Sequence, residues 1–234
     1  QNQQEVEVLN DLPTFLRREV IKETRGLYML LNPVFLAVRT LSARCFERLC
    51  CDSLHPNWVV PDEQIFSFGE LCNCMYFVGG GKLGYFQYSR ILQNLTSEQS
   101  KRNSRLSINS KREMVHEVHC HEGWNLCESV LWMHWVHYGD CTVINHSNLL
   151  KLQASDFQEL VCIYPFVKHI VCQHALLYVN VLNNLKDRSR RSDLFNSLEM
   201  IETDELMNPS KYDKRMRLAN LTTSANTTWL WQKR

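Results

Sequence analysis

The organisation of the chain is clearest in two neighbouring segments, His121-Glu122-Gly123-Trp124-Asn125-Leu126-Cys127-Glu128-Ser129-Val130-Leu131-Trp132 and Tyr138-Gly139-Asp140-Cys141-Thr142-Val143-Ile144. A run of residues typical of a strand ends at Gly123, and a short bend then carries one acid, Glu128. A small turn of apolar residues follows, and a new strand-like run begins after Gly139. This order predicts two strands joined by a compact cassette.

Short β-branched and aromatic runs lie on both sides of this cassette. They are divided by turn residues at Pro61-Asp62-Glu63, Gly69-Glu70 and Gly79-Gly80-Gly81. Short strands at this spacing predict an antiparallel roll or barrel and not a parallel sheet. The predicted strands are Trp58–Val60, Ile65–Phe66, Met75–Val78, Lys82–Phe86, Met114–Val118, Cys141–Ile144 and Leu149–Leu152.

Helices are predicted before and after the roll. Asp11-Leu12-Pro13 has the N-cap and first-turn proline of a helix entry, and the apolar spacing then stays helical to Glu23. A short helix is expected over Ser42–Cys50. After the roll, Ser155-Asp156 predicts a helix N-cap, and a longer helix spans Phe166–Leu185. The predicted fold class is α+β: an antiparallel, jelly-roll-like β-roll flanked by N-terminal helices and two C-terminal helices.

The chain has 234 residues and a formal net charge of +1. This near-zero charge argues against a strong positive electrostatic potential of the kind that binds nucleic acid. No apolar run approaches the roughly 20 residues that cross a bilayer, so we expect no direct membrane insertion of this piece. The polar start Gln1–Glu5 is not a signal peptide. Most of the ten cysteines lie in apolar patterns, which favours reduced thiols over the alternative of a disulfide framework.

Two segments are expected to lie outside the packed core. Thr96–Lys111 is rich in serine, asparagine and basic residues, as is typical of a long mobile loop. Alternatively, Arg102–Ser107 within this loop is a target for a kinase that recognises basic residues. From Asn208 onward the polar chain predicts an unordered tail. We predict linker-like helices over residues 1–35, a domain over residues 36–186 with a loop insertion at 94–113, and a C-terminal extension over residues 187–234.

This order of elements resembles the cyclic-nucleotide-binding domain family, preceded by the end of the linker found in cyclic-nucleotide-gated and related voltage-gated-type channels. The resemblance spans about residues 7 to 186. It is carried by Glu7–Pro13, Leu16–Val20, Asn32–Phe35, Pro61–Phe66, Gly69-Glu70, Met75–Val78, the hairpin glycine Gly81, Ser155–Phe157 and Tyr164-Pro165.

In that family the cassette reads phenylalanine-glycine-glutamate, a short helix, and then arginine beside a small residue. Its backbone N–H groups and the arginine hold the cyclic phosphate, and the glutamate accepts from the ribose. Here Leu126-Cys127-Glu128 keeps the acid but lacks the glycine, and Gly139 or Asp140 falls where the arginine is expected. Losing that contact removes roughly 1.5 to 3 kcal/mol. The resemblance therefore implies that cAMP or cGMP binds weakly or not at all.

The resemblance also assigns residues to two parts of this site. The degenerate nucleotide pocket consists of Leu126, Cys127, Glu128, Ser129, Val130, Gly139, Asp140, Cys141 and Thr142. The lid helix over the cassette contributes Val179, Leu182 and Lys186. Around the cassette, Trp124, Trp132 and Trp135 fill either the space that a purine takes elsewhere or an ordinary core.

Metal binding and catalysis find less support. Alternate residues of His116–Glu122 share a strand face and present His119 with His121, or His116 with Cys120, with Cys72-Asn73-Cys74 as a second source of ligands. Surface or core histidines are the favoured interpretation. No hydrolase, phosphate-loop or zinc-protease motif is present. We assign no metal ligand and no catalytic residue. The only candidate cofactors are cAMP and cGMP. We expect that the chain is not an enzyme.

The leading hypothesis is a cytosolic regulatory domain of a membrane ion channel or transporter, at the cytoplasmic face of a membrane, that acts in gating or assembly. Its expected partners are the transmembrane portion of the same polypeptide and homo- or hetero-oligomeric subunits, with no nucleic acid. One alternative is a functional cAMP or cGMP sensor in a channel, a sperm-type sodium/proton exchanger or a kinase regulatory subunit. A second alternative is a zinc-binding interaction module.

Overall fold

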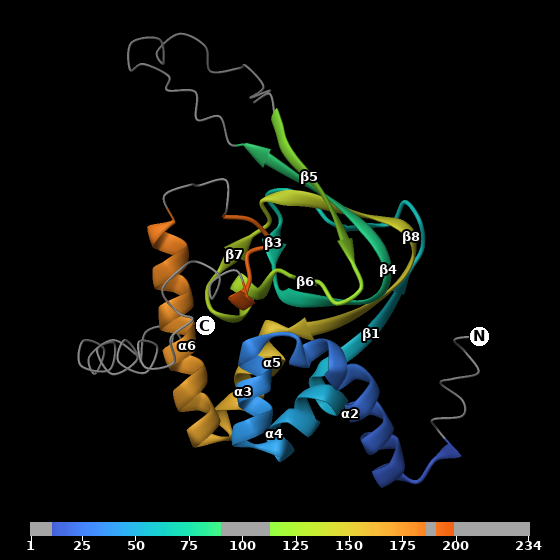
Figure 1. Cartoon of the computed structure of the whole chain (residues 1–234), viewed down its shortest axis with the longest axis vertical. Coiled ribbons are helices and arrows are strands. Elements are labelled where there is room, and N and C mark those ends of the chain that lie inside the picture. The colour runs from blue at the N-terminus through green and yellow to red at the C-terminus, as the bar shows by residue number, and fades with distance from the viewer. Residues whose placement is uncertain (1–10, 90–112, 186–190, 199–234) are drawn as a thin grey trace.

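A computed structural model describes residues 11–89, 113–185 and 191–198 of the chain (Figure 1). Helical segments precede the strands as α2 (Thr14–Leu30), α3 (Pro33–Leu41), α4 (Ala43–Arg48) and the π-helical turn η1 (Leu49–Ser53). Two further helices follow the strands, α5 (Ala154–Cys162) and α6 (Pro165–Asn184). Helices α2 to α5 lie at one end of the roll, and α6 stands beside it (Figure 1).

The strands of the described chain form one large antiparallel sheet and a separate pair. They are β1 (Leu54–Val59), β2 (Gln64–Phe66), β3 (Leu71–Cys72), β4 (Cys74–Ser89), β5 (Glu113–His121), β6 (Asn125–Leu126), β7 (Trp135–Val136) and β8 (Gly139–Gln153). The large sheet has the order β1-β8-β4-β5, with β2 paired to β8 and β6 paired to β4, while β3 pairs with β7. This antiparallel roll between two groups of helices confirms the predicted α+β fold class.

The glycine-rich turn predicted at Gly79-Gly80-Gly81 is wrong, because β4 runs through it as a single 16-residue strand. The glycines instead shift the register between β4 and β8. Gly81 has a φ of +93°, and a Cβ on it would lie 2.6 Å from the backbone oxygen of His146. Glycine is therefore required here by a β-bulge and not by a hairpin. Strand β8 likewise unites two strands that the sequence predicted separately.

Two predicted helix caps are also wrong. Helix α2 begins at Thr14 with Pro13 at its N-cap, and no side chain, including that of Asp11, caps it. Helix α5 begins at Ala154, ahead of Ser155, again without a side-chain cap. Neither helix start therefore uses the side-chain cap that the sequence predicted for it.

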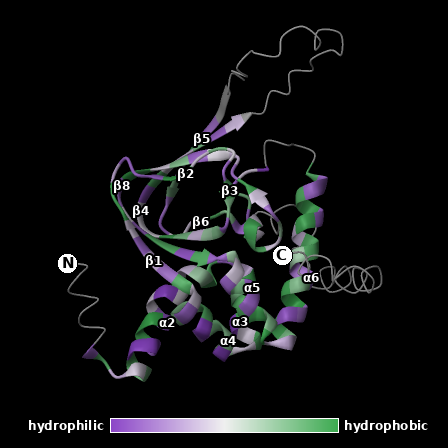
Figure 2. Ribbon diagram, turned by 180° about the vertical axis from the view of Figure 1, so that it is seen from behind, coloured by the Kyte–Doolittle hydropathy of each residue, from purple (hydrophilic) through white to green (hydrophobic). Residues whose placement is uncertain are grey.

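Three phenylalanines join the helices to the roll. Phe35 of α3 packs edge-to-face on Phe77 of β4 and on Phe157 of α5, with ring centroids 5.6 and 5.8 Å apart. All three side chains are buried. Figure 2 shows both apolar and polar residues along α2 and α6, as expected of helices with one buried side.

All ten cysteines are free in this structure, and their redox state stays a prediction. Among the described helices, none combines the length and apolar character that a bilayer span requires. Two predicted segments lie outside the described residues. They are the loop Thr96–Lys111, which includes the candidate kinase target Arg102–Ser107, and the tail from Asn208. The domain boundaries stay predictions, although residues 191–198 of the predicted C-terminal extension pack against the roll.

Candidate functional site

The cassette lies between β6 and β7 and contains the 3₁₀ turn η2 (Glu128–Leu131). The structure brings five predicted pocket residues together here, and all are buried: Leu126, Cys127, Glu128, Ser129 and Val130. Cys127 has a φ of +65°, in the left-handed region that favours glycine. Cys127 thus adopts the backbone conformation for which a glycine is the usual choice, and the chain turns sharply from β6 into η2.

Residues 191–198, which we name the plug segment, close this cassette. The backbone N–H of Cys127 donates to the backbone oxygen of Asp193 at 2.6 Å. The hydroxyl of Tyr178 in α6 donates to the backbone oxygen of Phe195 at 2.7 Å. Phe195 is fully buried. Part of the predicted polar extension is therefore integral to the folded site.

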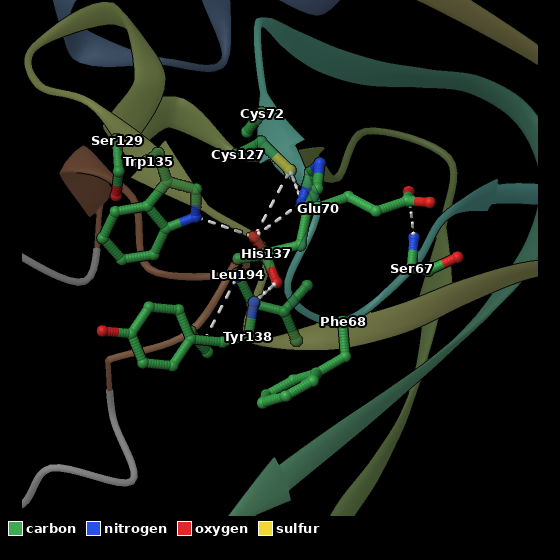
Figure 3. A network of polar contacts seen from close by, with 12 residues as sticks. Ser67, Phe68, Glu70, Cys72, Cys127, Ser129, Trp135, His137, Tyr138 and Leu194 are labelled. Atoms are coloured by element: carbon green, nitrogen blue, oxygen red, sulfur yellow. Dashed lines mark hydrogen bonds and ion pairs between the residues drawn. The ribbon is translucent and has the colours of Figure 1, made fainter. Parts of the chain in front are cut away.

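The buried carboxylate of Asp193 is the first of two anionic centres in the site. Trp135 Nε1 and His137 Nδ1 donate to its Oδ1 at 2.8 and 3.0 Å. Tyr85 Oη and the backbone N–H of Tyr138 donate to its Oδ2 at 2.9 and 2.7 Å. Figure 3 shows the side chains of Cys127, Trp135 and His137 directed toward a common point. The cassette therefore holds an anion, and the protein supplies it.

The imidazole of His137 faces this carboxylate. Burial by itself would lower the pKa of His137, but hydrogen bonds to Asp193 and Cys72 and their charges raise that pKa to about 9. Hydrogen bonds from Cys127 and His137 lower the pKa of the Cys72 thiol against the effect of its burial. The ring of Phe66 stacks on the imidazole with centroids 3.9 Å apart. These directions favour an imidazolium beside a carboxylate and a thiolate.

Glu128, which is fully buried, is the second anionic centre. Asn32 Nδ2 and Trp132 Nε1 donate to it at 2.6 and 3.2 Å. The plug segment donates through the backbone N–H of Ser197 at 2.9 Å and also through the Ser197 hydroxyl. His174 of α6 lies 3.8 Å away. The acid that the resemblance assigns to a ribose is thus occupied by protein donors.

The other four predicted pocket residues lie on β8. The carboxylate of Asp140 accepts from the backbone N–H of Phe68 at 2.7 Å and from Tyr88 Oη at 2.8 Å. A Cβ on Gly139 would meet the Tyr85 ring at 2.7 Å, so this position does not admit an arginine. Cys141 is buried and Thr142 is half-buried in the same strand.

Of the predicted lid residues, Leu182 is buried, Val179 is half-buried and Lys186 lies outside the described residues. The contacts of α6 with the cassette and with the plug segment are made one and two turns before Leu182. Tyr178 Oη lies 3.0 Å from Ser129 Oγ, and His174 Nε2 lies 2.9 Å from Ser197 Oγ. The spacing of four between His174 and Tyr178 is a helix-face signal that the sequence did contain.

Two of the three tryptophans around the cassette are buried and donate hydrogen bonds to its carboxylates. Trp132 and Trp135 are each 4% exposed, whereas Trp124 is 40% exposed. The indole of Trp132 also packs on Phe157 with centroids 5.8 Å apart. Each buried indole therefore both fills the core and donates a hydrogen bond to Glu128 or Asp193.

The histidine-rich strand is not where the candidate metal ligands meet. His116, His119 and His121 are exposed on β5. The described residues instead contain one group of ligating side chains with atoms within 4.8 Å of one another, Cys72, Cys127 and His137. Sequence reasoning missed this group because its members lie 55 and 10 residues apart, without a metal-site spacing.

The sequence matches no family model and no curated protein. Three solved structures to which the chain is similar are described as follows. The first is the C-linker/CNBHD of zELK channels crystallised in the presence of cAMP, with 16% identity, coverage of 69% of this chain and 68% of that chain, and a TM-score of 0.46. The second is a cyclic nucleotide-binding-like protein from Brucella abortus bv. 1 str. 9-941, with 12% identity, coverage of 58% and 97%, and a TM-score of 0.43.

The third is the N-terminal domain of a transcriptional regulator from Streptomyces coelicolor A3(2), with 17% identity, coverage of 66% and 92%, and a TM-score of 0.46. At these identities and TM-scores the likeness carries no argument about what this chain does. The function has to be argued from the contacts within the cassette.

Proposed function

We propose that this chain is a regulatory domain of the cyclic-nucleotide-binding type whose cassette is closed by its own plug segment, so that cAMP and cGMP bind weakly or not at all. It acts in the gating or assembly of a membrane ion channel or transporter and is not an enzyme. Its partners are the transmembrane part of the same polypeptide and neighbouring subunits, at the cytoplasmic face of a membrane.

One observation carries the proposal: the Asp193 carboxylate accepts hydrogen bonds from Tyr85, Trp135, His137 and the Tyr138 backbone. These donors form an anion site of the kind that a phosphate also fits. An external phosphate would have to displace a carboxylate that belongs to the same chain. If the closed state is favoured by about 3 kcal/mol, the apparent affinity for a nucleotide falls by roughly 150-fold.

The second acid extends this closure to the N-terminal helices. Asn32, which caps α3 by accepting from the backbone N–H of Val34 at 3.0 Å, also donates to Glu128 at 2.6 Å. Arg18 of α2 binds Glu47 and Asp52 at 2.7 and 2.9 Å, and so ties α2 to α4 and η1. A conformational change in the plug segment would therefore be transmitted to the N-terminal helices. In a channel, these helices lie next to the membrane portion.

The test is calorimetric titration of cAMP and cGMP into the whole chain and into Asp193→Ala. We expect no binding to the wild type at millimolar nucleotide, and a gain of at least 10-fold in affinity for the variant. Asp156→Ala, on α5, is the matched control and should behave as wild type. Far-UV circular dichroism confirms that each variant is folded, and Asp193→Asn replaces Asp193→Ala if the latter does not fold.

Tight binding by the wild type that is abolished by Glu128→Ala would contradict the proposal and establish the nucleotide sensor instead. Absence of binding to every folded variant would contradict the plug segment as the cause of insensitivity. For the membrane context, the full-length polypeptide should sediment with membranes, and Asp193→Asn should change its transport activity without added nucleotide. A full-length protein found only in the soluble fraction would contradict the channel or transporter assignment.

A further inference from the structure

Three ligating side chains from separate strand ends converge beside the cassette. Cys72 ends β3, Cys127 lies in the turn between β6 and η2, and His137 follows β7. All three are buried, and their ligand atoms lie within 4.8 Å of one another. Because β3 pairs with β7 and the pairing of Cys72 with Trp135 sets the register, the backbone itself brings Cys72 close to His137.

The donor set has the chemistry of a zinc site. Two thiolates and one imidazole are ligands that zinc favours, and three protein ligands leave the fourth position of a tetrahedral zinc ion to a further group such as water. Ligand atoms around a tetrahedral zinc lie about 3.3 to 3.8 Å apart, given bond lengths of about 2.0 to 2.3 Å. The observed spread of up to 4.8 Å therefore closes with side-chain shifts of about 1 Å.

The surroundings complete this arrangement. Asp193 Oδ1 lies 3.0 Å from His137 Nδ1, the relation by which carboxylates orient the ligating histidines of metal sites. The two thiolates would balance the charge of a divalent cation. Asp193 keeps its hydrogen bonds from Trp135 and Tyr85, so it would not be left as an unpaired buried charge.

We propose that Cys72, Cys127 and His137 form a buried zinc site, with Asp193 orienting His137. A bound zinc ion joins β3, the cassette turn and the end of β7, and holds the Asp193 end of the plug segment through His137. This site differs from the exposed histidine strand of β5.

The test starts with the whole reduced chain, freed of metal by a chelator and titrated with Zn²⁺ in competition with a chromophoric chelator. We expect one zinc per chain, a rise in the thermal unfolding midpoint, and, with Co²⁺ in place of zinc, a thiolate-to-cobalt charge-transfer band. Absence of zinc binding, or a cobalt spectrum without that band, would overturn the proposal.

Variants then locate the site. Cys72→Ser and Cys127→Ser should each weaken zinc binding at least 10-fold. Cys74→Ser and Cys141→Ser, which change buried thiols outside the group, and His119→Ala, on the exposed strand, should leave binding unchanged. Loss of zinc with His119→Ala and retention with Cys72→Ser would overturn the assignment.

A variant that does not fold is replaced by a measurement on the wild type. X-ray absorption at the zinc edge should show two sulfur neighbours at about 2.3 Å and nitrogen or oxygen neighbours at about 2.0 Å. A shell without sulfur would overturn the proposal. Zinc binding and nucleotide binding are measured in separate titrations, so the failure of one proposal is distinguishable from the failure of the other.

Discussion

Nδ1 of His137 lies 3.0 Å from Oδ1 of Asp193, although 56 positions separate the two residues in the sequence. Both side chains are buried. The pair joins the end of β7 to the plug segment, so the cassette is closed by a contact within the chain. The stability of the fold and the state of the cassette are therefore coupled at this one pair.

Replacing Asp193 with alanine should lower the free energy of unfolding by about 3 to 5 kcal/mol, because it leaves a buried imidazolium and three further donors without an acceptor. Urea denaturation followed by circular dichroism measures the change. Asp156→Ala, at a partly exposed acid, should stay within about 0.5 kcal/mol of wild type. A loss below about 1 kcal/mol for Asp193→Ala would show that the plug segment does not hold the fold.

Glu128→Gln keeps the size of the side chain but replaces one acceptor oxygen with a donor. Because Asn32, Trp132 and Ser197 all donate to Glu128, we expect a loss of about 2 to 4 kcal/mol in the free energy of unfolding. The amide of Ser197 should also exchange its hydrogen faster, as mass spectrometry can measure. The exposed Glu122→Gln is the control, and equal exchange in both variants would refute this role of Glu128.

Alanine at Gly81 and at Gly80 should have opposite effects, although the residues are adjacent in β4. Gly81 has a positive φ, and a Cβ there would crowd Ser147 and the His146 backbone, so Gly81→Ala should cost about 2 to 4 kcal/mol. A Cβ on Gly80 would have no atom within 4 Å, and Gly80→Ala should be neutral or stabilise by about 0.5 kcal/mol. Similar denaturation midpoints for the two variants would argue against the bulge.

Phe35→Ala should lower the free energy of unfolding by about 3 to 5 kcal/mol, because it leaves a cavity where α3, β4 and α5 pack together. Phe15→Ala, at a side chain that is 70% exposed, is the control and should cost less than about 1 kcal/mol. Thermal unfolding of both variants checks the difference. Equal effects would mean that the helices do not depend on this aromatic cluster.

The roll and its order were predictable because alternating β-branched and aromatic runs signal strands locally. The strand lengths were not, since Gly79-Gly80-Gly81 has the same composition in a turn and in a bulge. Only the pairing with β8 distinguishes the two. The helix caps also differ from the prediction: α2 and α5 begin without a side-chain cap from Asp11 or Ser155.

In the site, the contiguous residues Leu126 to Val130 could be predicted, because one short stretch supplies them all. The residue that faces the anion was not predicted, since counting along the chain placed Gly139 or Asp140 at the arginine position and His137 was not considered. The structure resolves this by sterics at Gly139 and by the hydrogen bonds of Asp140 on β8. Whether these residues form a nucleotide pocket stays a prediction.

The amino-acid sequence alone determined the fold class and the position of the cassette, because each depends on local periodicity, turn chemistry and composition. Only the tertiary structure decided that Asp193 enters the cassette and that Cys72, Cys127 and His137 meet. These contacts join residues that are as many as 108 positions apart, as between Tyr85 and Asp193. Their formation depends on how the closed roll brings distant segments together, which no local pattern encodes.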